Sequence, residues 1–208
     1  MSHREIPDAR SGSRRWRSHP VNAPVAWLPT LLAKGPANLH RDHLRRQPVP
    51  VDLPRLHLIA LDASGSMRRG GRLASAKGHA ARLIEAAAWA GDDVALLSFG
   101  GQGIAWLMTP GRARRASGLR VRSVGGGGGT PLAAALRESG RVLSRRRGPS
   151  ERWLWLLTDG RSLEQPEAPA AADRIVIIDF DSSAGPGRCA NWAARWGAEH
   201  RLAQASSA

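Results

Sequence analysis

The strongest constraint on the fold is a set of short, almost wholly apolar segments that alternate with helical patterns after residue 54. Four of these segments cover residues 55–62, 93–99, 152–158 and 174–180. Strands that are apolar on both faces belong inside a sheet whose two sides are covered. Residues 72–90 and 130–146 instead carry apolar side chains at helical spacing. The alternation predicts an α/β domain with helices on both faces of a parallel sheet.

Shorter segments complete the expected sheet. Residues 103–108 follow a turn-like Gly-Gly-Gln-Gly, so we expect them to pair with 93–99 as one antiparallel edge strand. We also expect a short helix over 166–172, a last helix ending over 191–196 and a short edge strand over 198–202. The prediction is a doubly wound, mostly parallel, six-stranded, Rossmann-like sheet over residues 55–205.

Residues 1–54 differ from the rest because they are basic, rich in proline and without a clear period. We interpret them as an arm or linker with one short helix near 28–33. The first residues carry charge but no apolar core, so we expect no secretory signal. No apolar run approaches the ~20 residues of a membrane helix. The single cysteine, Cys189, excludes an intrachain disulfide and favours a cytoplasmic protein.

The formal net charge is +14, which raises the question of an acidic partner. Of the 31 basic residues, all except Lys34 and Lys77 are arginine, a bias that genome composition can also produce. The charge is spread along the chain and aromatic residues do not interleave with it, as they would in a single-strand binder. The pattern therefore favours an acidic protein over nucleic acid.

Oxygen-bearing side chains follow two predicted strands and precede one predicted helix. Asp62, Ser64 and Ser66 form Asp-Ala-Ser-Gly-Ser, Asp159 stands in Thr-Asp-Gly, and Thr130 follows five glycines as the expected helix N-cap. In open α/β sheets, ligands collect at the carboxyl ends of strands. Hard oxygen donors suit Mg²⁺, with Mn²⁺ and Ca²⁺ as alternatives, rather than zinc or copper. Such an ion, with few carboxylates around it, would attract another carboxylate from outside.

The sequence offers no catalytic apparatus. Ser64 lacks the Gly-x-Ser-x-Gly elbow of a hydrolase, and no histidine is placed by a motif to act as its base. The glycine run 125–129 lacks the Gly-Lys-Ser/Thr ending of a phosphate loop. We therefore expect no catalytic residues, no bound nucleotide and no activity of the isolated chain.

The order Asp-x-Ser-x-Ser, distant Thr, further Asp resembles the metal-ion-dependent adhesion site (MIDAS) of the von Willebrand factor A (VWA) family. The resemblance implies that the hydroxyls of Ser64, Ser66 and Thr130 contact the metal ion. It also implies that Asp62 and Asp159 support the ion, often through water, and that an Asp or Glu of a partner completes the shell.

Longer stretches narrow the resemblance. DASGSM, ASAKGHAARL, DDVALLSF and GGGTPLAAAL are similar to the C-terminal VWA part of the magnesium-chelatase D subunit and related cobalt-chelatase proteins, over roughly residues 25–205. This implies a non-catalytic subunit in tetrapyrrole or cobalamin biosynthesis that connects an AAA+ ATPase to the large chelatase subunit. The D subunit's AAA+ module and acidic linker have no counterpart in this sequence, which resembles a split version. The alternative is a stand-alone VWA adaptor for another AAA+ machine.

Overall fold

The computed structural model describes residues 15–17, 24–47, 49–51, 54–114, 118, 121, 129–145, 151–181 and 187–203. Its contacts divide the chain into two compact units, Met1–Leu53 and Pro54–Ala208. Glycines 125–128 of the glycine run, much of the basic segment 112–124, and residues 204–205 lie outside the described residues.

The second unit is built on a six-stranded sheet with the order β5-β4-β3-β6-β7-β8. Strands β4 and β5 pair antiparallel, and the other neighbours are parallel. The predicted fold class is thus confirmed, including the antiparallel edge strand. The strands are β3 (Leu56–Asp62), β4 (Asp93–Gly100), β5 (Gly103–Arg112), β6 (Arg152–Thr158), β7 (Arg174–Asp179) and β8 (Glu199–Leu202).

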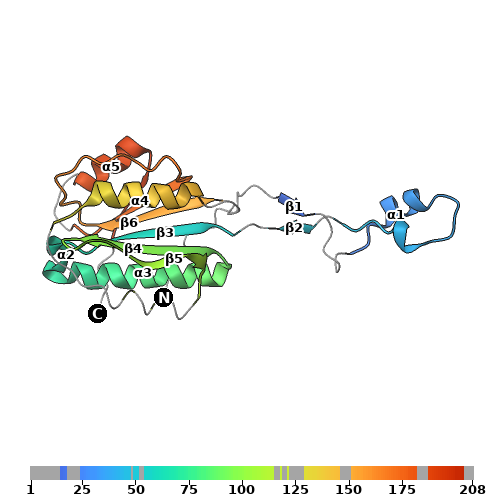
Figure 1. The fold of residues 1–208 in the computed structure, drawn as a ribbon, viewed down its shortest axis with the longest axis horizontal. Coiled ribbons are helices and arrows are strands. Elements are labelled where there is room, and N and C mark those ends of the chain that lie inside the picture. The colour runs from blue at the N-terminus through green and yellow to red at the C-terminus, as the bar shows by residue number, and fades with distance from the viewer. Residues whose placement is uncertain are drawn as a thin grey trace. The chain divides into compact units, whose positions relative to one another are not determined.

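Helices cover both faces of this sheet (Figure 1). Helix α3 (Arg72–Ala90), preceded by α2 (Gly65–Arg68) and a 3₁₀ turn over Arg69–Gly71, lies on one face; α4 (Leu132–Arg145) and α5 (Arg188–Trp196) lie on the other. Side chains alternate across the strands, so β3 sends Ile59 and Leu61 toward α3 and sends Leu58 and Ala60 toward α4 and α5. The two apolar clusters explain why the central strands β3, β4, β6 and β7 carry apolar side chains on both faces.

Three expectations about local structure need correction. No helix forms over 166–172, where a turn closes through the Ala172 N–H and the Pro169 carbonyl at 2.9 Å. Pro166 and Pro169 lack amide hydrogens and crowd a preceding helical turn, which disfavours a helix there. Strand β5 continues beyond 108 to Arg112, and α4 begins at Leu132 rather than at residue 130.

The first unit contains a two-stranded antiparallel sheet, β1 (Arg15–Arg17) with β2 (Val49–Val51), and helix α1 (Trp27–Lys34), where a short helix is expected from the sequence. A 3₁₀ turn follows over Arg41–His43. Thr30 is the buried residue of α1, and its hydroxyl accepts a bond from the Arg45 N–H at 2.9 Å. None of the helices in the described ranges has both the length and the apolar composition needed to cross a bilayer.

Candidate functional site

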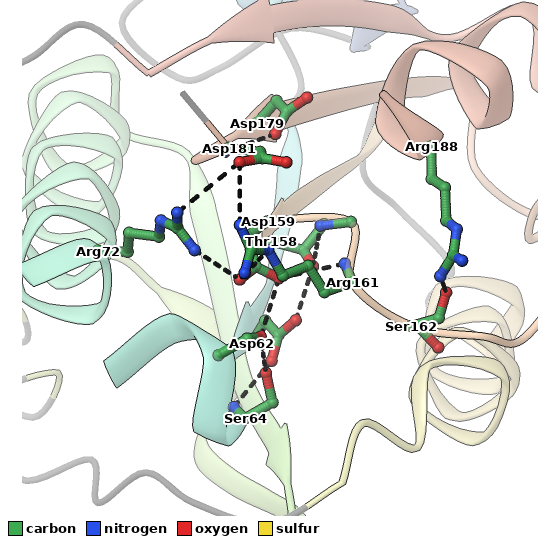
Figure 2. Close-up of polar contacts among 12 residues, drawn as sticks. Asp62, Ser64, Arg72, Thr158, Asp159, Arg161, Ser162, Asp179, Asp181 and Arg188 are labelled. Carbon is green, nitrogen blue, oxygen red and sulfur yellow. Dashed lines mark hydrogen bonds and ion pairs between the residues drawn. The ribbon is translucent and has the colours of Figure 1, made fainter. Parts of the chain in front are cut away.

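The sheet topology brings two of the predicted site residues to one edge. Strands β3 and β6 are parallel neighbours, and Leu61 lies opposite Leu157. The residues that follow Leu61 and Leu157 therefore leave the sheet at the same edge. Asp62 ends β3 and Asp159 follows β6, although they lie far apart in the sequence. Figure 2 shows both side chains close together at this edge. The local reason is that both strands end in a polar turn after a largely apolar run.

Asp62 is buried and held by neutral donors. Its Oδ1 accepts the Ser64 N–H at 2.8 Å, and its Oδ2 accepts the Thr158 hydroxyl at 2.6 Å. Burial raises the pKa of the Asp62 carboxyl above its usual value, with a smaller rise from the charge of Asp159, while the hydrogen bonds from Thr158 and Ser64 oppose the shift. A positive charge placed at this carboxylate would offset its cost of desolvation.

A chain of oxygen atoms links the Asp-x-Ser-x-Ser turn to Asp159. The hydroxyl oxygens of Ser64 and Ser66 lie 3.1 Å apart, and the Ser66 hydroxyl donates to Asp159 Oδ1 at 3.1 Å. Asp159 also accepts the Arg161 N–H at 3.2 Å through the same oxygen. Four of the five predicted ligands therefore form one connected cluster.

Thr130, the fifth predicted ligand, lies on the wall of a cavity of about 380 Å³ that it shares with Ser64 and Ser66. The expectation that Thr130 caps α4 is wrong, because Thr130 and Pro131 precede the helix. The Glu164 carboxylate, from the loop after β6, instead accepts the Ala133 N–H at 2.5 Å. A remote acid thus caps the helix, and the remaining cavity wall is Gly129, Arg161, Ser162, Leu163 and Glu164.

Gly100, which sequence reasoning does not select, allows β4 to end directly against the Asp-x-Ser-x-Ser turn. A Cβ atom at this position would lie 2.9 Å from the Ala63 carbonyl oxygen and 3.3 Å from the Ser64 nitrogen. The Ala63 N–H in turn donates to the Phe99 carbonyl at 2.7 Å. In the sequence, the only sign of this close approach is a glycine at the end of a strand. Ordinary turns commonly have a glycine at the same place, so the residue alone does not predict the contact.

Two arginines that sequence reasoning does not select form a ring of ion pairs with two aspartates beside the cluster (Figure 2). Arg72 lies 3.3 Å from Asp159 and 3.7 Å from Asp181, measured between nitrogen and oxygen atoms. Arg161 lies 3.8 Å from Asp159 and 3.5 Å from Asp181. In a chain so rich in arginine, no local pattern distinguishes these two.

The loop after β6, which carries Arg161 and Leu163, is fastened at several points. Arg188 of α5 donates to the Ser162 carbonyl, and Arg195 donates to the Gln165 side chain at 2.7 Å. Together with the Glu164 cap on α4, these bonds fix one wall of the cavity against both helices on that face.

The chemistry of the donor set fits a hard divalent cation. The described residues contain no group of three or more His, Cys, Asp or Glu side chains that could hold a metal ion by themselves. The cluster offers instead two buried carboxylates, Asp62 and Asp159, beside serine and threonine hydroxyls. Oxygen-only donors suit Mg²⁺, Mn²⁺ or Ca²⁺, which commonly keep waters in part of their shell. Asp62 is the group that most needs a cation, since both of its hydrogen-bond donors are neutral.

Known proteins resemble this chain in sequence and in fold. Residues 57–161 match the von Willebrand factor type A domain family. The magnesium-chelatase 60 kDa subunit of Rhodobacter capsulatus is 37% identical over 123 residues, which are 57% of this chain and 21% of that subunit. This chain therefore spans about one fifth of the length of that relative.

Solved structures share the fold at low sequence identity. A von Willebrand factor type A protein from Catenulispora acidiphila has a TM-score of 0.58 and 18% identity, covering 78% of this chain and 40% of that one. The manganese-loaded TRAP protein of Plasmodium vivax has a TM-score of 0.56 and 19% identity, covering 73% and 68%. With a family match over half of its length and the sheet order described above, the chain belongs to the von Willebrand factor type A domain family.

Proposed function

We propose that this chain is the metal-dependent, protein-binding subunit of an ATP-dependent metal chelatase that acts on a tetrapyrrole. In this role it connects an AAA+ ATPase to the large chelatase subunit in the cytoplasm and breaks or forms no covalent bond itself. The observation that carries the proposal is the cluster of Asp62, Ser64, Ser66 and Asp159 beside the Thr130 cavity. Similarity to a magnesium-chelatase subunit supports the choice of machine.

The residues that would hold the ion are the hydroxyls of Ser64, Ser66 and Thr130, with Asp62 and Asp159 supporting it directly or through water. Mg²⁺ is the proposed ion, because the donors are all oxygen and the carboxylates are few. The ion would supply a Lewis-acidic position for a carboxylate of the partner. The protein's own contribution is to hold the five oxygen-bearing side chains in one place and keep their carboxylates out of bulk water.

The proposal is tested by co-purification with the separately expressed ATPase and large subunits of a magnesium chelatase and of a cobalt chelatase. We expect capture in Mg²⁺ and loss of capture in excess chelator. Asp62→Ala and the milder Ser66→Ala should both abolish the Mg²⁺-dependent capture, with circular dichroism showing that the fold persists. Glu138→Gln, which removes a carboxylate on α4 that pairs with Arg141 at 3.2 Å, is the matched control.

Capture that is unchanged by chelator, or by both site variants, would refute the role of the metal. Binding to neither set of chelatase subunits would instead favour a VWA adaptor for a different AAA+ machine. Preference for the magnesium or the cobalt subunits would identify the pathway.

A further inference from the structure

The ring of ion pairs places one guanidinium on the wall of the proposed binding cavity. Arg161 lines the cavity together with Ser64, Ser66 and Thr130. Its side chain is 44% exposed, against 20% for Arg72, 19% for Asp181 and 0% for Asp159. Arg161 is thus the member of the ring that a ligand in the cavity can reach.

The contacts of Arg161 inside the ring are loose. Its side-chain nitrogens lie 3.8 Å from Asp159 and 3.5 Å from Asp181, whereas charge-assisted hydrogen bonds to carboxylates are about 2.7–2.9 Å long. A guanidinium carries five N–H donors in a planar fork that matches a carboxylate. Arg161 can therefore take a further carboxylate without giving up a strong bond. Arg72 makes the closer contact with Asp159, at 3.3 Å, and holds that side chain in position.

The charge balance points the same way. Asp62, Asp159, Asp181 and the cavity-lining Glu164 with Arg72 and Arg161 carry two net negative charges when all are ionised, and a divalent cation neutralises them. The Glu164 carboxylate is already engaged by the Ala133 N–H at the start of α4. The loaded site would then present two separate attractors for anions, the ion and the Arg161 guanidinium. Leu163, 87% exposed on the same cavity wall, offers the partner an apolar contact beside these two groups.

We propose that Arg161 is a second anchor for the partner, which is an acidic segment with two carboxylates close together in sequence. One carboxylate completes the shell of the ion, and the other pairs with the guanidinium of Arg161. This inference rests on the proposed function, since it requires a partner carboxylate at the metal. It adds that a partner with a lone acidic residue binds poorly.

Synthetic nine-residue peptides test this inference. One peptide has a single glutamate among alanine and glutamine, and three others have a second glutamate two, three or four positions away. Fluorescence anisotropy measures their binding to the full chain at saturating Mn²⁺ and 150 mM NaCl, and calorimetry measures Mn²⁺ binding separately. For the wild-type chain, we expect the best two-glutamate peptide to bind at least about tenfold more tightly than the single-glutamate peptide.

Arg161→Gln should remove this preference. Because the change also removes a positive charge beside Asp159, each variant is compared at the Mn²⁺ concentration that calorimetry shows to saturate it. Arg141→Gln, on the exposed surface of α4, should keep the preference. If single-glutamate binding requires Mn²⁺ but a second glutamate adds nothing, or the preference survives Arg161→Gln, the second anchor is refuted and the proposed function stands. If Mn²⁺ binds and no peptide does, the second anchor is refuted, and co-purification with the chelatase subunits separately decides the proposed function.

Discussion

Replacing Gly100 by alanine tests the packing that places the Asp-x-Ser-x-Ser turn. The new Cβ would lie 2.9 Å from the carbonyl oxygen of Ala63 and 3.0 Å from its carbonyl carbon. Both atoms belong to buried backbone, which cannot rotate away as a flexible side chain can. The turn that carries Ser64 must therefore move by several tenths of an ångström.

The expected cost follows from two opposing effects. Overpacking of a close-packed interior costs about 1–3 kcal/mol. Loss of glycine's freedom in the unfolded chain returns up to about 1 kcal/mol. We expect a net loss of about 1–2 kcal/mol in the free energy of unfolding, and a metal affinity reduced by at least about tenfold, because the displaced turn carries two proposed ligands.

Urea unfolding followed by circular dichroism, and calorimetric titration with Mn²⁺, measure the two effects. Gly78→Ala is the matched control, since the same change in the interior of α3 meets only Arg82 at 3.8 Å. It should raise the free energy of unfolding by about 0.5–1 kcal/mol and leave Mn²⁺ affinity unchanged. If Gly100→Ala also proved stabilising and bound Mn²⁺ like wild type, the contact would not position the turn.

Three further predictions follow from the local packing of single residues. Because burial raises the pKa of Cys189, the native chain should resist alkylation at pH 8 by intact-mass measurement; rapid labelling would contradict this. Burial lowers the pKa of His79 to about 4, from 6.5 in the unfolded chain. The free energy of unfolding should therefore fall by about 1–3 kcal/mol as pH drops through that window, the lower figure allowing for the partial exposure of the ring. His79→Gln should remove this loss in urea titrations. Gly160 has φ +68°, and a Cβ atom there would lie 2.8 Å from Cys189 Sγ, so Gly160→Ala should lower the free energy of unfolding by about 3 kcal/mol. Gly197→Ala, at φ +62° with open space around the new Cβ, should lower it by about 1 kcal/mol. Equal losses in urea unfolding would contradict the clash with Cys189.

The sheet could be predicted because its strands are recognisable one at a time. The apolar runs of β3, β4, β6 and β7 can each be recognised without knowing which strands lie beside them, and α3 and α4 between the runs indicate parallel pairing of β3 with β4 and β6. Strands β6 and β7 are also parallel, although the connection between them contains no helix. The helix expected over 166–172 fails because alanines within the segment favour a helix while two prolines in it prevent one.

The oxygen donors of the site could also be found from sequence, since Asp62, Ser64, Ser66 and Asp159 follow recognisable strands. Their surroundings could not, because these depend on which side chains tertiary packing brings close. Arg72 of α3 and Arg161 of the loop after β6 both reach Asp159, although they lie far apart in the sequence. The acid that caps α4 is 31 residues away in sequence, and no local rule selects it over the other carboxylates.

The bond between Thr158 and Asp62 spans 96 residues, so the two halves of the site come from distant segments that only the folded sheet holds together. A chain that misfolds between them would lack the binding place proposed for the ion. Ion binding would therefore report complete folding, and an ion at a hundred times its dissociation constant would stabilise the native chain by about 2.7 kcal/mol. A cell short of that ion would hold less of the protein in a form that resists degradation.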